Sequence, residues 1–425
     1  MIAWLLISFF VLLFLGVPIA MSLGLSAMGG ILFLGGGSTV TIAQRMFEGM
    51  NSFALLAIPL YTFAGFTMSK GGISKRLMDF CYSIVGHIYG GLAHVNVLSS
   101  MIFAGISGSA VADTAGVSGM FMPEMIRKGY SKNFTVAVTA ISSTIGIIIP
   151  PSIPMVVIAG ICGISTGKLF LGGIFPGILC GRAQMIVSYF LAKKEGVPKE
   201  PGHFTIGPVL HGLWESWPAL LMPIIIVGTI TMGIVSPTEA GVIAVVYGLF
   251  AGGIIYRELK WEDIKFAFAE TVRTSGRIFI VIGAAKLYTV MLTTAGFDKW
   301  VAKTMLGFST NPTVILIMIL LIFFIVTMFM ESIATLTLFM PILYPIALGV
   351  GINPIVLSVL ITVVIGIGLV TPPVGMCIYV ACDLMDTTVG EVFPTLVPFI
   401  AATFVCIALM VAFPQLILLP TYLMA

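Results

Sequence analysis

The sequence predicts an all-α polytopic membrane protein built from inverted repeats, with two re-entrant hairpins and broken helices. Hydrophobic residues make up 59% of the 425 residues and charged residues only 9%, whereas an average soluble domain has about 25% charged residues. A Gly-rich apolar run that ends in two prolines occurs twice, at Gly146–Pro151 and Gly368–Pro373. A proline pair lacks backbone donors and stops a helix. Helices broken within a bilayer usually mark a transport site.

The two halves of the chain are related by a repeat that extends beyond the prolines. Three pairs of identical residues share a separation of 222 positions: Gly146 with Gly368, Pro150 with Pro372, and Thr166 with Thr388. Upstream, Met120–Pro123 resembles Leu338–Pro341 at a separation of 218, so the second copy has four extra residues in a connecting loop. Loops tolerate such insertions. The halves are therefore expected to be homologous.

The order of the segments predicts about ten membrane spans in all. Met1–Ala20 lacks a basic region and runs directly into another apolar stretch, which favours a first span over a cleaved signal peptide. A polar linker, Lys193–His211, divides the chain near its middle. Arg257–Arg277 mixes charges with aromatic residues and predicts either an amphipathic helix on the membrane surface or a plain cytoplasmic connector.

Basic residues predict opposite orientations for the two halves. The loop Ile126–Asn133 contains three basic residues, and the matching loop Tyr344–Asn353 contains none. By the positive-inside rule the first loop is cytoplasmic and the second is not, as an inverted repeat requires. The chain has no Lys or Arg after Lys303, so a regional bias also contributes to this contrast.

Each half contains a segment rich in small and hydroxyl residues that suits a re-entrant hairpin. The first is Gly105–Gly119 and the second is Met330–Pro341. Their hydroxyls belong to Ser107, Ser109 and Thr114 in the first and to Ser332, Thr335 and Thr337 in the second. Hydroxyls and freed carbonyls can replace the hydration shell of a small cation, and sodium suits such oxygens. Close packing of helices through small residues is the alternative explanation.

Four carboxylates are expected at membrane depth. They are Asp113, Glu239, Glu331 and Asp383. Ionisable groups there are costly and are either functional or held by hydrogen bonds. Glu239 follows Ser-Pro-Thr and is explained by the start of a helix. Asp113 and Glu331 lie inside the hairpin segments and are the functional candidates.

Other residue patterns narrow the range of possible functions. The six cysteines show no CxxC spacing, so packing is favoured over a disulfide framework or a zinc site. No nucleic-acid signature is present.

Gly105–Gly108 matches the GxSG motif of intramembrane serine proteases, but Gly116–Gly119 matches it too, and no downstream membrane-embedded His is available as a base. A cation channel is a further alternative and needs a continuous polar path.

Three motifs together resemble the large membrane subunit of tripartite ATP-independent periplasmic (TRAP) transporters. They are "GSAVADTAG", "GIVSPTEAG" (Gly233–Gly241) and the paired proline breaks. The resemblance covers essentially the whole chain and is closest to the sialic acid branch. It implies a multi-pass protein of the bacterial inner membrane, an elevator-type secondary transporter rather than an enzyme. Sodium would be the coupling ion, with no other cofactor.

The resemblance also implies substrate and partners. The expected function is import of a carboxylated organic solute, sialic acid (N-acetylneuraminate), with C4-dicarboxylates or another organic acid as the alternative. A periplasmic substrate-binding protein would deliver this solute. A small four-helix membrane subunit would be a separate polypeptide, since neither end of this chain carries a candidate for it.

The family's site residues carry over to matching positions of this sequence. The first sodium site would use Ser107, Ser109, Gly146, Ile149 and Pro151, and the second Ser332, Thr335, Gly366, Gly368 and Thr371. A carboxylated substrate is expected between the hairpin tips, where helix N-termini favour an anion without any buried Lys or Arg. The residues expected near it are Asp113, Thr114, Glu331, Pro150, Pro372 and Pro373.

The chain is accordingly divided into fixed and moving parts. Residues 1–94 are expected to form scaffold helices, and residues 182–311 a linker with scaffold and amphipathic helices. Residues 95–181 and 312–398 would form the two repeats of the transport domain, each with a hairpin and a broken helix. Residues 399–425 would form a C-terminal helix.

Overall fold

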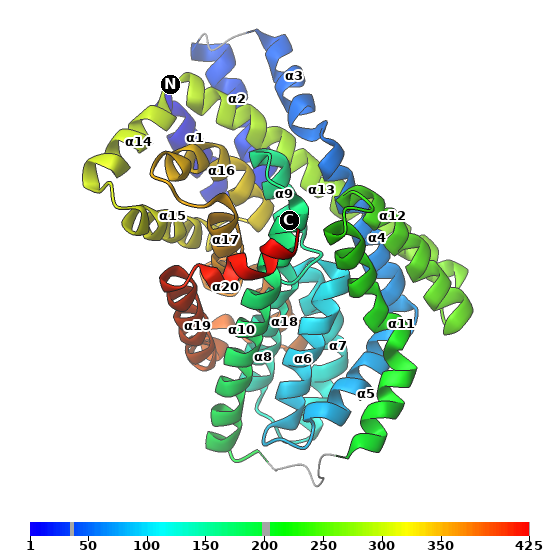
Figure 1. Cartoon of the computed structure of the whole chain (residues 1–425). Helices are drawn as coiled ribbons and strands as arrows, with labels where there is room; N and C mark the ends of the chain where they lie inside the picture. The colour runs from blue at the N-terminus through cyan, green and yellow to red at the C-terminus, as the bar shows by residue number, and fades with distance from the viewer. Residues whose placement is uncertain (35–37, 198–204, 425) are drawn as a thin grey trace.

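The computed structural model describes residues 1–34, 38–197 and 205–424, and its regular elements there are helices (Figure 1). Residues 198–204 of the expected linker lie outside the described residues. Seven described helices are long and apolar enough to cross a membrane. They are η1–α4 (Phe53–Lys70), α10 (Thr166–Lys194), α11 (Ile206–Thr231), α12–η3 (Pro237–Ile255), α13 (Trp261–Thr294), α16 (Ser332–Gly349) and α19 (Val389–Ala412).

The N-terminal region consists of shorter helices. They are α1 (Ile2–Phe14), α2 (Ile19–Leu34), α3 (Thr39–Met50), η1 (Phe53–Leu56), α4 (Ala57–Lys70) and α5 (Ile73–Val85). The expected first span, Met1–Ala20, is divided, because α1 ends at Phe14 and Gly16 takes a left-handed conformation (φ 81°) before α2. Pro18 directly precedes α2. This region therefore begins with two antiparallel apolar helices of 13 and 16 residues.

The same order of elements occurs twice, which agrees with the predicted repeat. The first copy is α6 (Gly91–Ser107), α7 (Ala110–Arg127), α8 (Lys132–Ser143), η2 (Thr144–Ile147), α9 (Ile153–Cys162) and α10. The second is α15 (Pro312–Thr327), α16, α17 (Pro354–Gly368), α18 (Met376–Met385) and α19. Each copy is a helical hairpin followed by a helix that stops at a proline pair and resumes beyond it.

Both predicted breaks are confirmed. No α-helix covers residues 144–152 or 369–375, and the peptide bonds Pro150–Pro151 and Pro372–Pro373 are cis. After the first break, Ser152 caps α9 by accepting a hydrogen bond of 3.3 Å from the Met155 N–H. The chain therefore stops and restarts a helix inside an apolar region without leaving it.

One long helix replaces the separate surface helix or connector expected for Arg257–Arg277. α13 runs without interruption through 34 residues, from Trp261 to Thr294. It continues past Arg277 because the following residues, Ile278 to Ala285, are apolar or small. α13 lies against α2, α3, α4 and α16. The remaining helices are α14 (Phe297–Phe308), α20 (Gln415–Leu418), η4 (Leu419–Met424) and η3 (Ala251–Ile255).

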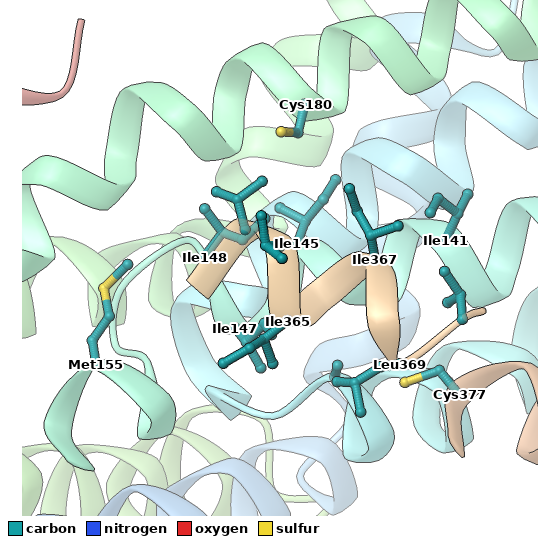
Figure 2. Packing of buried hydrophobic residues seen from close by; sticks show 14 of the residues in the cluster. Ile141, Ile145, Ile147, Ile148, Met155, Cys180, Ile365, Ile367, Leu369 and Cys377 are labelled. Atoms are coloured by element: carbon teal, nitrogen blue, oxygen red, sulfur yellow. The ribbon is translucent and has the colours of Figure 1, made fainter. Parts of the chain in front are cut away.

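The two breaks share one hydrophobic core. Figure 2 shows isoleucines of both broken helices, among them Ile147 and Ile365, packed together on the side of α10 that carries Cys180. A methyl group on Gly366 would lie 3.3 Å from Thr144 Cβ, so the two helices approach closely. This packing holds the two proline breaks next to each other and positions the site.

Candidate functional site

The first hairpin turns over two residues, and its tip rests on the first break. α6 ends at Ser107, Gly108 is left-handed (φ 63°), and Ser109 caps α7. The Gly108 carbonyl accepts a hydrogen bond of 3.2 Å from the Ile153 N–H. A methyl group on Gly108 would lie 2.7 Å from the Pro151 carbonyl oxygen. Glycine is therefore required here both for its conformation and for the close approach.

Most residues of the first predicted sodium site lie together at this tip. The Ser107 hydroxyl is buried and has no hydrogen-bond partner in the part of the chain that the structure describes. A methyl group on Gly146 would lie 3.5 Å from the Ser109 carbonyl oxygen, and Pro151 lies against the tip as described above. Ile149 directs its side chain toward α10, so only its carbonyl is available to a ligand. An unpartnered hydroxyl beside backbone carbonyl oxygens fits a small cation.

The second hairpin begins its inner helix with a carboxylate. α15 ends at Thr327, and Glu331 is the N-cap of α16. The Glu331 carboxylate accepts hydrogen bonds from the N–H groups of Ile333 (3.0 Å) and Ala334 (3.3 Å), and from the Ser332 hydroxyl (2.8 Å). The expectation that this helix start offers free N–H groups to an anion is therefore wrong for these two donors.

The second tip also rests on its break. The Met328 carbonyl accepts a hydrogen bond of 2.9 Å from the Val374 N–H. A methyl group on Gly368 would lie 2.6 Å from Thr327 Cβ, so α17 packs directly on the end of α15. Gly366 faces the first break instead, as described above.

The hydroxyls of this second set are engaged within their own helices. Thr335 donates to the Glu331 carbonyl (3.1 Å), and Thr371 donates to the Ile367 carbonyl (2.7 Å). A hydroxyl has two acceptor lone pairs besides its proton. These oxygens therefore keep the capacity to coordinate a cation.

A cavity of about 620 Å³ lies between the two hairpin tips and the helices α4 and α13. The first tip contributes Ser107 and Ser109, and the second contributes Glu331 and Ser332. The opposite wall includes Thr62, Ser69 and Lys70 from α4, and Glu270, Thr274 and Arg277 from α13. The cavity has the size of a site for a small organic molecule.

The other predicted residues do not belong to the cavity wall that the described residues form. They are Asp113, Thr114, Gly146, Ile149, Pro150, Pro151, Thr335, Gly366, Gly368, Thr371, Pro372 and Pro373. The breaks that contain the proline pairs contact the hairpin tips on the side away from the cavity. Asp113 and Thr114 are fully buried, because the face of α7 that meets the cavity is formed by Ala112, Ala115 and Gly116.

Sequence reasoning missed the wall formed by α4 and α13. It assigned no Lys or Arg to the anion site, and the exposed side chains of Lys70 and Arg277 line the cavity. Glu270, Thr274 and Arg277 recur at intervals of four and three residues, which places them on one face of a helix. That spacing was the available signal, and it was hidden by the assumption that the helix ends at Arg277.

Residues 6–416 match the family "Tripartite ATP-independent periplasmic transporter, DctM component". The chain belongs to this family. It is therefore a membrane component of a TRAP transporter rather than an enzyme, and the predicted resemblance is confirmed.

Relatives within the family carry different substrates in their names. The chain is 37% identical to the isethionate TRAP transporter permease protein DctMQ of Oleidesulfovibrio alaskensis, over 92% of this chain and 62% of that protein. It is 35% identical to the sialic acid permease SiaM of Vibrio cholerae, over 96% and 95% of the two chains. It is equally 35% identical to the C4-dicarboxylate permease DctM of Pseudomonas aeruginosa, over 95% and 94%.

A solved transporter shares the fold. The YdaH transporter of Alcanivorax borkumensis, described as having an unusual topology, superposes with a TM-score of 0.59 at 13% identity. The match covers 89% of this chain and 88% of that one. The likeness therefore extends over nearly the whole helical arrangement.

Proposed function

We propose that this TRAP subunit imports an organic anion together with sodium, whose downhill entry drives the import. The observation that carries this proposal is the cavity in which both hairpin tips face Lys70 and Arg277. Cationic side chains and the N-terminus of α7 both favour an anionic group. The cavity holds the substrate, and the hairpin tips beside it hold the coupling ions.

Arg277 is the best-placed group to bind the substrate anion. Glu270, on the same wall, is paired with Arg273 (2.6 Å). The Lys70 ammonium lies 4.8 Å from the centre of the Phe266 ring. Arg277 has no ion-pair partner among the described residues, so its guanidinium is available for a bidentate contact with a carboxylate or sulfonate.

Sodium coupling is supported by the oxygen atoms at the two tips. The first set offers the unpartnered Ser107 hydroxyl together with backbone carbonyls near Ser109 and Gly146. The second set offers hydroxyls of Ser332 and Thr335. A bound sodium ion would supply positive charge beside the substrate, which links occupancy by cation and by anion.

The proposed motion is an elevator movement of one part of the chain against the other. Residues 95–181 and 312–398 contain both hairpins and both breaks and form the moving part, with the two halves inserted in opposite orientation. The remaining helices, including α4 and α13, form the scaffold. The cavity lies between the two parts, so sliding would carry it from one membrane face to the other.

The proposed partners are a small four-helix membrane subunit and a periplasmic binding protein that delivers the substrate. The relatives are named for isethionate, sialic acid and C4-dicarboxylates at similar identity. All of these are organic anions, so the class is better supported than any one member. Sialic acid is the first substrate to test, followed by C4-dicarboxylates and isethionate.

The test is uptake of each radiolabelled acid into proteoliposomes that contain this chain and its small partner, with the binding protein outside. Uptake of one acid that requires both an inward sodium gradient and the binding protein is expected. Uptake without sodium, or no uptake of any organic anion by a folded complex, would contradict the proposal.

Arg277→Gln tests the cavity itself, with Arg273→Gln as the matched control one turn away. Loss of a charge-assisted contact is expected to raise the concentration for half-maximal uptake about tenfold, equivalent to about 1.4 kcal/mol. The control removes a charge that pairs with Glu270 and should change this concentration less than threefold. Equal effects of the two substitutions would show that Arg277 contributes only general positive charge.

A further inference from the structure

A buried carboxylate without a partner lies one helical turn behind the first hairpin tip. Asp113 is 0% exposed. Neither of its carboxylate oxygens has a hydrogen-bond partner within residues 1–34, 38–197 and 205–424. A carboxylate out of water costs several kcal/mol unless it is paired or hydrogen-bonded. A proton, or a cation that is not part of the described chain, must therefore balance it.

The surroundings of Asp113 are hydroxyl groups from three helices. The Ser100 hydroxyl, on α6, lies close to the carboxylate. Thr114, the next residue on α7, donates a hydrogen bond of 2.6 Å to the Ser143 hydroxyl on α8. α18 completes the enclosure through Cys377, which lies beside Thr114 and Ser143. This group of oxygens is separated from the cavity by the body of α7.

Two of these hydroxyls also donate hydrogen bonds to groups other than Asp113. Ser143 donates to the Ala140 carbonyl (2.7 Å). Ser100 donates to the Ser142 hydroxyl (3.1 Å). Each of these oxygens has lone pairs that a cation can use. A cation satisfies the carboxylate and the hydroxyl oxygens at the same time.

We propose that Asp113, Ser100, Thr114 and Ser143 bind a sodium ion at a third site, which adjoins the first tip set because a methyl group on Gly146 would lie 3.5 Å from Asp113 Cβ. All four ligands are oxygens, which suits a hard cation, and one carboxylate balances one positive charge. This site extends the proposed sodium coupling, and the inference depends on that coupling. It also ties the first hairpin to α18 of the second repeat through Cys377.

The rival explanation is a carboxyl group that keeps its proton and donates it to one hydroxyl. Asparagine at this position retains the shape and the donor but removes the charge. Asp113→Asn therefore separates the two explanations, because a protonated carboxyl tolerates the exchange and a cation site does not.

The experiment measures equilibrium binding of radioactive sodium to the purified full chain with its small partner in detergent. Asp113→Asn is expected to bind one ion fewer than the unmodified protein, or to bind one ion at least tenfold more weakly. Ser99→Ala is the matched control, since Ser99 is also a buried hydroxyl on α6 but faces Cys81 of α5. The control should bind sodium as the unmodified protein does.

Several outcomes overturn the inference. Unchanged sodium binding by Asp113→Asn would leave the proton as the partner of Asp113. If Ser109→Ala and Asp113→Asn remove the same ion, and the double variant removes no second one, the cluster is part of the first site. If the unmodified protein binds no sodium, the proposed coupling and this site both fail. If it binds sodium and Asp113→Asn binds sodium equally well, only this site fails.

Two further variants cover the case in which Asp113→Asn does not fold. Ser100→Ala and Thr114→Val each remove one hydroxyl ligand and keep the carboxylate. Each is expected to weaken binding of one sodium ion about threefold to tenfold. Unchanged affinity in both would contradict the site.

Discussion

The two hairpins place their carboxylates differently. In the second hairpin, Glu331 lies at the tip, lines the cavity and accepts hydrogen bonds from two N–H groups of its own helix. In the first, the neutral Ser109 caps the helix, and the carboxylate of Asp113 lies one turn deeper without a partner. The repeat has kept the backbone breaks while the charged groups have diverged.

This difference makes the two hairpin tips electrostatically unequal, which the repeat alone does not predict. Glu331 already neutralises the positive end of α16, so an anion is repelled from the second tip and favoured at the first. Lys70 and Arg277 lie on the scaffold wall and attract it further. The substrate anion is therefore expected to lie nearer to Ser109 than to Ser332.

Gly108→Ala is expected to have the largest effect on stability. The substitution adds a side chain in the left-handed region and places it 2.7 Å from the Pro151 carbonyl oxygen. The combined cost is about 2–4 kcal/mol in the free energy of unfolding. Unfolding in mixed detergent and SDS micelles measures it.

Gly163→Ala is the control for Gly108→Ala. Gly163 is also left-handed (φ 67°), but no atom lies within 4 Å of an added methyl group. Only the conformational cost of about 1 kcal/mol is expected. Equal losses for the two variants would mean that the first tip does not press on its break.

The breaks and hairpins were predictable because their causes are local. A proline pair stops a helix whatever surrounds it, and Gly108 marks a turn through its own conformational freedom. The length of α13 was not predictable in the same way, because the charged residues near Arg277 indicated a surface segment. Only the packing of α13 against α2, α3, α4 and α16 shows that it is one helix.

The sequence predicted several residues of the candidate site but not how they are arranged. The sequence identified Ser109 and Asp113 as functional candidates, and both lie near the first break. It did not show that α7 turns Ala112 and Ala115 toward the cavity and Asp113 away from it. The direction of a helix face depends on its neighbours, which a single sequence does not specify.

Gly368→Ala and Gly146→Ala compare the packing of the two breaks and have the next largest expected effect. A methyl group on Gly368 would lie 2.6 Å from Thr327 Cβ, whereas one on Gly146 would meet no atom closer than 3.5 Å. Gly368→Ala is expected to cost about 1–3 kcal/mol. Gly146→Ala should change stability by less than about 0.5 kcal/mol. Thermal unfolding without sodium measures both, and a larger loss at Gly146 would reverse the comparison.

The smallest expected effects concern the two helix caps. Glu331 makes two cap hydrogen bonds of 3.0 and 3.3 Å, whereas Ser109 makes one of 3.5 Å. Glu331→Ala should therefore cost about 1–2 kcal/mol and Ser109→Ala about 0.5 kcal/mol in sodium-free detergent. Adding sodium should stabilise the Glu331→Ala protein and the unmodified protein more than the Ser109→Ala protein, because only Ser109→Ala affects the first sodium set. An equal response of all three proteins to sodium would show that Ser109 acts only as a cap, which would remove the functional difference between the two tips.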